Sequence, residues 1–361
     1  MLKNRLKVLI LAPSETADGG IKNYYQVLKN YFSIPVYYQY RGAREWPYRG
    51  NSFSEGIRLL KDYISYFINV ILTHIQIVHI NTSLGKESIL RDFIFAIYAK
   101  MTRKKCIVFF HGWSQNEEIL MMNNYKWLLK LYLKNTDALI TLSKKSQEIL
   151  ESLGYKKNIY LETTLVDDNL LNNFNIAKKL QKCSDEITIL FLARIEREKG
   201  VFDIINACEL LTQRGYKIQL LVAGSGRAEK DVMEKIKNKN YIKFLGYVSG
   251  EDKSRVYSES DIYVLPSYTE GMPTTVLEAM AFGLPLLVTP VGGLKDIIKE
   301  GLNGYFIPID NNIVLAEAII RLINNKDLMY NMSLYNYDDA QKYYASNVVK
   351  RIEKIYMELL K

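Results

Sequence analysis

The segment Tyr268-Thr-Glu-Gly-Met-Pro-Thr-Thr-Val-Leu-Glu-Ala-Met-Ala-Phe-Gly-Leu-Pro285 decides the fold of this 361-residue chain. It follows an apolar run that predicts a strand, and it predicts a Gly-Met-Pro turn and a helix that begins near Thr274. The free backbone N–H groups at the start of such a helix, with Thr274 and Thr275 as further donors, suit a bound anion. Two carboxylates flank that start, Glu270 in the turn and Glu278 about one turn inside the helix.

These two carboxylates indicate a ligand that carries hydroxyl groups. Ionised carboxylates only accept hydrogen bonds, so they suit sugar hydroxyls and, for Glu278, the vicinal hydroxyls of a ribose. The plainer interpretation is an N-capped helix with incidental acids. Gly271, Pro273 and the Gly283-x-Pro285 that follows frame the pair and argue against that interpretation. The segment therefore predicts a site for a ligand with both an anionic group and sugar hydroxyls.

Short apolar runs alternate with longer amphipathic stretches along the whole chain. In the first half we expect strands at 8–12, 75–80, 105–110 and 138–142 and helices at 20–31, 55–72, 87–101 and 118–134. In the second half we expect strands at 188–193, 218–223, 242–245, 262–265 and 285–288 and helices at 201–214, 227–238, 253–260 and 274–282. This alternation is typical of α/β proteins whose parallel sheets are covered on both faces.

The length of the chain predicts two domains, because 361 residues exceed what one ordinary hydrophobic core holds. The polar stretch 172–186 is interpreted as the linker, which gives domains 1–170 and 171–344. We expect residues 345–361 to contain a last helix, at 348–360, that packs back on the first domain. Ligands of doubly wound sheets bind beyond the carboxyl ends of the strands, so we expect the active site in a cleft between two such domains.

The phrase Glu-Gly-Met-Pro-Thr-Thr-Val-Leu-Glu-Ala-Met-Ala-x-Gly-x-Pro, with seven residues between Glu270 and Glu278, resembles the signature of the retaining GT-B glycosyltransferases of family 4. Further motifs follow in that family's order over nearly the full chain, with a looser match in the first half. The resemblance implies a GT-B fold, two doubly wound Rossmann-like domains that face each other across a cleft. It also implies transfer of a hexose from a UDP- or GDP-linked donor, with retained configuration and without a cofactor.

The resemblance assigns the donor site to the second domain. In Leu192-Ala-Arg-Ile-Glu-Arg-Glu-Lys-Gly200 it implies that Arg194 and Lys199 hold the donor diphosphate, although the family more often has glycine at Ala193. The cations would stabilise the charge that grows on the leaving group. With Glu270 placed to position the sugar, the resemblance implies a further set of donor-binding residues: Gly224, Tyr247, Val248, Met272, Thr274, Thr275 and Glu278.

The Gly224-Ser-Gly226 turn is by itself a weak signal, because Glu229 stands where a dinucleotide-binding fingerprint has its third glycine. In the first domain, Gly19 and Gly20 follow the first strand, where paired glycines allow close approach to phosphate; a flexible turn is the alternative. His111 ends a strand, and the resemblance implies that it contacts the donor sugar.

Two further residues of the first domain are candidates for the acceptor side. Asn81 and Ser83 lie just beyond the strand at 77–80, and we expect them to hydrogen-bond the acceptor. The other two histidines have plainer interpretations: His79 packs within its strand, and His74 lies in a helix or turn.

Positive charge is concentrated in the first half. Residues 1–170 carry 23 Lys or Arg against 15 Asp or Glu, whereas residues 171–361 carry 25 against 24. Nucleic acid, an anionic membrane surface and a phosphorylated substrate all fit such a bias. Between Lys86 and Lys100, apolar residues recur at helical spacing, which favours a membrane-surface helix over a nucleic-acid contact. A half-buried core helix with a basic end fits that stretch equally well.

The cysteines, the lack of metal-ligand spacing and the hydropathy of the chain limit which cofactors and which cellular location are expected. Cys106, Cys183 and Cys208 have no disulfide or zinc spacing, and the sequence contains no Asp-x-Asp and no metal-ligand cluster. The N-terminal run reads as a strand rather than a signal peptide, and no stretch approaches the roughly 20 apolar residues of a membrane span. We therefore expect a cytoplasmic enzyme that uses no metal and is peripheral at the inner membrane face.

Three function classes compete on this reading. The first is a glycosyltransferase of surface polysaccharide biosynthesis, with a saccharide or polyprenyl-diphosphate-linked acceptor and no nucleic-acid partner. Within it, a donor phosphate oxygen takes the acceptor's proton, as the resemblance implies. The second is a GT-B-like nucleotide-sugar epimerase, and the third a non-catalytic nucleotide-sugar-binding protein. A dehydrogenase is disfavoured, because no predicted strand leads into a full Gly-x-Gly-x-x-Gly.

Overall fold

The computed structural model describes residues 6–17, 19–41, 52–181 and 185–361. The chain forms two compact units, Met1–Thr163 with Ala345–Lys361, and Thr164–Tyr344. The sequence placed the boundary after residue 170. In the structure the segment before that point already belongs to the second unit, because Val166 forms a β-bridge with Tyr344.

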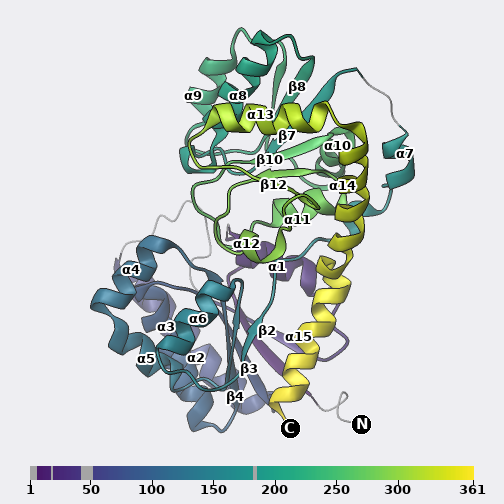
Figure 1. The fold of residues 1–361 in the computed structure, drawn as a ribbon. Helices are drawn as coiled ribbons and strands as arrows, with labels where there is room; N and C mark the ends of the chain where they lie inside the picture. The colour runs from purple at the N-terminus through teal and green to yellow at the C-terminus, as the bar shows by residue number, and fades with distance from the viewer. Residues whose placement is uncertain (1–5, 18, 42–51, 182–184) are drawn as a thin grey trace. The chain divides into compact units, whose positions relative to one another are not determined.

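The first unit is built on a six-stranded parallel sheet in the order β2-β1-β3-β4-β5-β6. Its strands are β1 (Val8–Ala12), β2 (Val36–Tyr40), β3 (Ile77–Ser83), β4 (Lys105–Gly112), β5 (Ala138–Thr141) and β6 (Ile159–Leu161). Its helices are α1 (Gly20–Leu28), α2 (Ser52–Leu72), α3 (Lys86–Met101), α4 (Gln115–Asn124), α5 (Lys126–Leu133), α6 (Lys144–Ser152) and α15 (Ala345–Leu359). In Figure 1, α2, α3 and α5 lie on one side of β3 and β4, and α15 lies on the other. The main core joins the sheet to α2, α3, α5 and α6.

The second unit repeats the scheme with a six-stranded parallel sheet in the order β12-β11-β10-β7-β8-β9. Its strands are β7 (Ile187–Leu192), β8 (Ile218–Ala223), β9 (Ile242–Gly246), β10 (Ile262–Leu265), β11 (Leu286–Val288) and β12 (Gly304–Phe306). Its α-helices are α7 (Ile176–Leu180), α8 (Val201–Gln213), α9 (Glu229–Ile236), α10 (Gly250–Glu259), α11 (Thr274–Ala281), α12 (Leu294–Ile297), α13 (Asn312–Ile323) and α14 (Lys326–Asp339). Short 3-10 helices lie at η1 (Asp168–Leu171), η2 (Arg197–Lys199) and η3 (Ala340–Tyr343). The prediction of an α/β chain with two doubly wound sheets is confirmed.

Several predicted elements need correction. The helix expected at 118–134 is two helices, α4 and α5, which meet at Tyr125. The edge strands β2, β6 and β12 were missed, and so were α13 and α14. Both β6 and β12 have only three residues, too few for a periodic pattern to emerge.

The stretch 172–186 is not simply a polar linker. Its helix α7 packs on the second unit, where Lys179 Nζ donates to the carbonyl oxygens of Tyr257 at 3.0 Å and Phe282 at 2.9 Å. Phe174 packs against Phe282 in a tilted arrangement, with ring centroids 4.6 Å apart. Buried partners far along the chain give this polar sequence its structure, and polarity alone did not reveal them.

The last helix, α15, is anchored in the first unit. Arg351 forms an ion pair with Glu162 at 2.9 Å, next to β6. Glu353 accepts a hydrogen bond from the Ser33 hydroxyl at 2.6 Å. Tyr356 is buried, and its hydroxyl lies 2.5 Å from His79 Nδ1. The polar contacts fix the register of an amphipathic helix whose apolar side supplies the burial.

Helix α3 corresponds to the 86–100 stretch. It buries Ile89, Phe95, Ala96 and Ala99 in the core, whereas Leu90, Ile94 and Met101 are exposed. Within the described ranges, no helix is long and apolar enough to cross a membrane. The thiols of Cys106 and Cys208 are buried, which raises their pKa, and Cys183 lies outside the described residues.

Candidate active site

The loop after β7 brings Lys199 and Glu270 together. Lys199 Nζ lies 2.6 Å from Glu270 Oε1 and 3.3 Å from the Thr269 carbonyl oxygen, and the two charged side chains are only 13% and 10% exposed. Gly200 permits this approach, since a Cβ there would lie 2.2 Å from the Pro266 carbonyl oxygen. The sequence predicted both residues as site residues but not that they form an ion pair.

Arg194, the second predicted cation, lies between β7 and η2 with its side chain exposed. The backbone that carries it packs against the Gly224-Ser-Gly226 turn. A Cβ at Gly224 would lie 1.9 Å from the Ala193 carbonyl oxygen, and one at Gly226 would lie 2.4 Å from that of Ile195. Glycine is therefore required at both positions, because a side chain would prevent the turn after β8 from packing on the loop that carries Arg194.

Glu270 and Gly271 form a turn that a neighbouring turn supports. Gly293 N–H donates to the Gly271 carbonyl oxygen at 2.7 Å. A Cβ at Gly292 would lie 2.2 Å from the Glu270 carbonyl oxygen. Met272 is buried, and its carbonyl oxygen accepts from the Thr164 hydroxyl; its predicted contact with the donor stays a prediction.

Helix α11 begins at Thr274, as the sequence predicted, and follows Pro273. The Thr275 hydroxyl lies 2.8 Å from the Tyr263 hydroxyl, which also lies 3.0 Å from the Leu192 carbonyl oxygen. Tyr263 thereby ties the first turn of α11 to the end of β7. Because Thr275 already has this partner, Thr274 and the backbone N–H groups are the better donors for an anion.

Glu278 is buried, and both of its oxygens have protein partners. Lys253 Nζ lies 2.5 Å from Oε1, and the Tyr257 hydroxyl donates to Oε2 at 2.8 Å. Burial and the carboxylate raise the pKa of Tyr257 well above its usual range, so this hydroxyl stays a donor. Sequence reasoning missed both partners, which come from α10. A carboxylate keeps further lone pairs for ribose hydroxyls after accepting these two bonds.

A cavity of about 470 Å³ opens between the sheet and α10. Tyr247 and Val248, the predicted base contacts, lie at its edge, and Tyr247 is 75% exposed. Its further lining comes from β7, β8, β9 and α10 and includes Thr188, Leu221, Lys243, Leu245, Asp252 and Arg255. An exposed aromatic ring beside a cavity is suited to stacking against a planar base.

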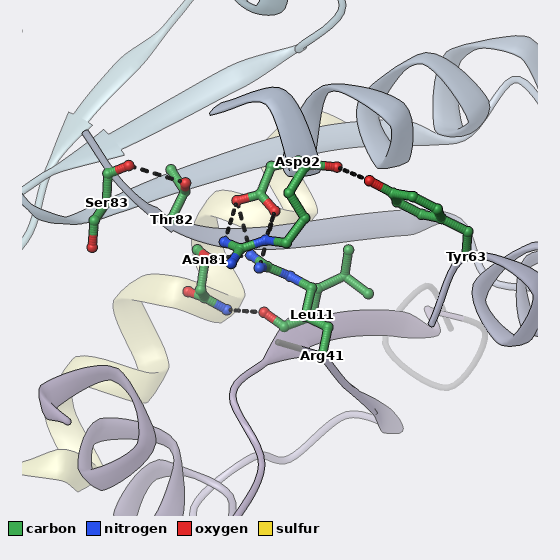
Figure 2. Close-up of polar contacts among 8 residues, drawn as sticks. Leu11, Arg41, Tyr63, Asn81, Thr82, Ser83 and Asp92 are labelled. Carbon is green, nitrogen blue, oxygen red and sulfur yellow. Dashed lines mark hydrogen bonds and ion pairs between the residues drawn. The ribbon is translucent and has the colours of Figure 1, made fainter. Parts of the chain in front are cut away.

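In the first unit, Asn81 lies in a buried hydrogen-bond network (Figure 2). Its Oδ1 accepts from the Tyr25 hydroxyl at 2.8 Å and from His111 Nε2 at 2.9 Å, and its Nδ2 donates to the Leu11 carbonyl oxygen at 2.9 Å. The Asn81 carbonyl oxygen accepts from Arg41. These protein contacts hold the Asn81 side chain in place, and its predicted contact with an acceptor stays a prediction.

Asn81 determines how His111 is presented. Because Asn81 Oδ1 can only accept, His111 Nε2 carries the hydrogen and Nδ1 is left as an acceptor. Burial, and then the nearby His79, lower the pKa of His111 well below its usual range, so the ring is neutral. The ring packs on Phe109 with centroids 3.8 Å apart. A neutral acceptor nitrogen of fixed orientation suits a sugar hydroxyl.

Ser83, His79 and His74 are the other residues of the first unit that the sequence analysis named. A Cβ at Gly112 would lie 2.4 Å from Ser83 Oγ, so Ser83 lies beside the end of β4, and Figure 2 shows it next to Thr82. His79 is buried in β3, as expected, and burial lowers its pKa to about 3. His74 lies in the turn after α2, with a positive φ of 50°.

Arg41 and Asp92 form an almost fully buried ion pair, with the two charged groups 2.9 Å apart (Figure 2). The sequence did not predict this pair. Burial lowers the pKa of Arg41 to about 10. Gly19 caps α1 with a φ of 141°, and open space surrounds the Cβ position of both Gly19 and Gly20. Asp18, before them, lies outside the described residues. Throughout the described ranges, no three His, Cys, Asp or Glu side chains are placed to hold a metal ion.

Comparison with known proteins finds glycosyltransferases that are similar to this chain. Residues 172–339 match the model of the family described as glycosyl transferases group 1. An uncharacterized glycosyltransferase of Methanocaldococcus jannaschii is 31% identical over 52% of this chain and 49% of its own length. The capsular polysaccharide biosynthesis glycosyltransferase CapM of Staphylococcus aureus is 25% identical over 63% of this chain and 60% of its own. The chain thus spans about half to three fifths of the length of these two relatives.

A solved structure extends the likeness to the whole fold. HepE of Anabaena in complex with UDP-glucose superposes with a TM-score of 0.70 at 18% identity, covering 98% of this chain and all of that one. The chain therefore has the two-domain α/β fold of this solved structure, and residues 172–339 of its second unit match the glycosyl transferases group 1 family.

Proposed function

We propose that the protein is a retaining glycosyltransferase of family 4 that transfers a hexose from a UDP- or GDP-linked donor. The Lys199–Glu270 pair ahead of the start of α11 carries this proposal. A lysine suits the donor diphosphate, and a carboxylate suits the hydroxyls of the attached sugar. Among similar proteins, HepE was solved with UDP-glucose, which supports a UDP-linked donor.

In the proposed reaction, the bond between the anomeric carbon and the diphosphate oxygen breaks, and the acceptor oxygen bonds to the same face of that carbon. Arg194, Lys199 and the N–H groups of α11 stabilise the negative charge that grows on the leaving diphosphate. An oxygen of that diphosphate takes the acceptor's proton, so no protein base is assigned. Because protein groups neutralise the diphosphate, the proposed transfer requires no divalent ion.

The remaining predicted residues have proposed roles in holding the substrates. Glu270 orients the sugar, Glu278 binds the ribose through lone pairs that Lys253 and Tyr257 leave, and Tyr247 with Val248 contacts the base. In the first unit, Nδ1 of His111 accepts from a sugar hydroxyl. Gly19 and Gly20 let the backbone approach phosphate, and Ser83 contacts the acceptor.

The proposed acceptor is a saccharide or a polyprenyl-diphosphate-linked saccharide in surface polysaccharide biosynthesis. The name of CapM, a capsular polysaccharide enzyme, supports this class. We place the reaction at the cytoplasmic face of a membrane with anionic lipids, since basic residues outnumber acidic ones 23 to 15 in residues 1–170.

The proposal is tested with the purified protein and a panel of UDP- and GDP-sugars. A true donor raises the melting temperature and releases its nucleoside diphosphate when an acceptor is present. Arg194→Ala and Glu278→Ala should then lose release, and EDTA should not change it. Donor consumption that does not depend on an acceptor would indicate the epimerase, and stabilisation without release would indicate a binding protein.

A further inference from the structure

Helix α2 carries large apolar side chains on two opposite faces. Its inner face buries Tyr66 and Val70 in the core of the first unit. Its outer face carries six side chains that are between 42% and 77% exposed: Phe53, Ile57, Leu60, Ile64, Ile68 and Ile71. Spacings of three and four residues place all six on one side of the helix. This set, named here the α2 stripe, runs for about 27 Å at 1.5 Å per residue.

The apolar surface continues on the neighbouring helices. Helix α2 packs on α3, and α3 packs on α5, along the same side of the sheet (Figure 1). Leu90, Ile94 and Met101 are exposed on α3, and Trp127 and Leu131 are exposed on α5. Single exposed apolar residues are ordinary, but a row of this length marks a surface that meets another apolar body.

Most of the exposed charges on this segment are positive. Between residues 52 and 134, Glu87 is the exposed acidic residue, Glu55, Glu117 and Glu118 are half-buried, and Asp62 and Asp92 are buried. The exposed basic residues of the same segment are Lys61, Lys100, Arg103, Lys105, Lys126, Lys130 and Lys134. On this segment, exposed basic residues therefore outnumber exposed acidic residues by seven to one, and Lys61 lies on α2 itself.

We infer that the α2 stripe docks on a lipid bilayer with anionic headgroups and lies along its interface. Lysine is depleted where proteins meet proteins, but it is favoured beside anionic lipids. Glu55, Arg58 and Lys61 within α2 prevent the helix from crossing the bilayer, whereas a helix that lies in the interface keeps such groups in water. This inference names the membrane partner of the proposed function, although lipid binding itself does not depend on glycosyl transfer.

Vesicle flotation tests the inference with the full chain. Wild type should bind vesicles of phosphatidylcholine with 30% phosphatidylglycerol, and binding should weaken in high salt or on phosphatidylcholine alone. The triple variant Ile57→Ser, Ile64→Ser and Ile71→Ser should weaken binding on the order of a hundredfold, since each aliphatic side chain loses its burial. The control variant Ile313→Ser, Leu302→Ser and Leu334→Ser removes exposed aliphatics of the second unit and should bind as wild type does.

Charge provides an independent arm that does not touch α2 packing. Lys126→Gln with Lys130→Gln should weaken binding to the anionic vesicles about fivefold per charge. Binding by the triple variant equal to wild type would overturn the inference. The inference would also be overturned if the α2 stripe were a dimer interface. In that case light scattering would show a wild-type dimer and a monomeric triple variant, and the triple variant would bind lipid as wild type does. Donor-induced stabilisation is measured on the same samples, so that loss of lipid binding with intact donor binding separates this inference from the proposed function.

Discussion

Replacing Lys199 by methionine separates what this residue does for stability from what it does for transfer. Lys199 and Glu270 lie 2.6 Å apart and are 13% and 10% exposed, so Lys199→Met leaves a largely buried carboxylate without its partner. Removing one member of a buried pair costs about 3 to 5 kcal/mol, and the remaining exposure favours the lower figure. For a unit of this size, about 3 kcal/mol lowers the melting temperature by roughly 6 to 12 °C. Transfer should fall about 10² to 10³-fold, because the leaving diphosphate loses a cation.

The double variant Lys199→Met with Glu270→Gln supplies the control. Removing the carboxylate charge as well should restore most of the melting temperature but none of the transfer rate. Melting is followed by circular dichroism, and transfer by release of the nucleoside diphosphate. If the double variant regained activity together with its stability, the role of Lys199 would be structural and not catalytic. Transfer by Lys199→Met alone at the wild-type rate would also contradict a role in transfer.

Three more predictions follow from single contacts. Gly224→Ala should lower the free energy of unfolding of the second unit by more than about 2 kcal/mol in urea, because its Cβ would meet the Ala193 carbonyl oxygen at 1.9 Å. The control Gly215→Ala, also at positive φ but in open space, should cost only about 1 kcal/mol. Equal losses in the two variants would contradict this prediction. Tyr257→Phe removes a donor to Glu278 and should weaken nucleotide binding about fivefold by calorimetry, with unchanged affinity as the adverse result. Burial lowers the pKa of His79 to about 3, below its unfolded value near 6.5, so the unfolded state binds the proton first and stability is lost as pH falls from about 6.5 towards 3. Urea unfolding across that pH range should show that the free energy of unfolding falls more steeply for wild type than for His79→Gln, by up to about 1.4 kcal/mol per pH unit. Equal slopes for the two proteins would show that His79 is not the group responsible.

Buried strands were the most predictable part of the fold. The runs at 8–12, 218–223 and 262–265 coincide with β1, β8 and β10, because strands covered on both faces are continuously apolar. The start of α11 at Thr274 was also predicted, from the proline and glycine that precede it. Three-residue edge strands have no comparable local signal. Helix α13 was missed although Asn311 caps it and Leu315, Ile319 and Leu322 recur at helical spacing.

The partners of the site residues were not predictable in the same way. Glu278 meets Lys253 and Tyr257 from α10, and Lys199 meets Glu270 from 71 residues away, contacts that depend on the packing of separate elements. Asn81 was predicted to contact an acceptor because it follows an apolar run, but its contacts with three neighbouring elements were not predicted. Periodicity likewise did not show that α2 leaves one of its two apolar faces exposed.

Glycosyl transfer with retained configuration can be followed by a proton NMR time course with the nucleotide sugar that most raises the melting temperature. For a retaining transferase, nucleoside diphosphate and glycosyl product should accumulate together, and the first product formed should have the anomeric configuration of the donor. A donor that stays intact, becomes epimerised, or yields a product of opposite configuration would contradict retaining glycosyl transfer.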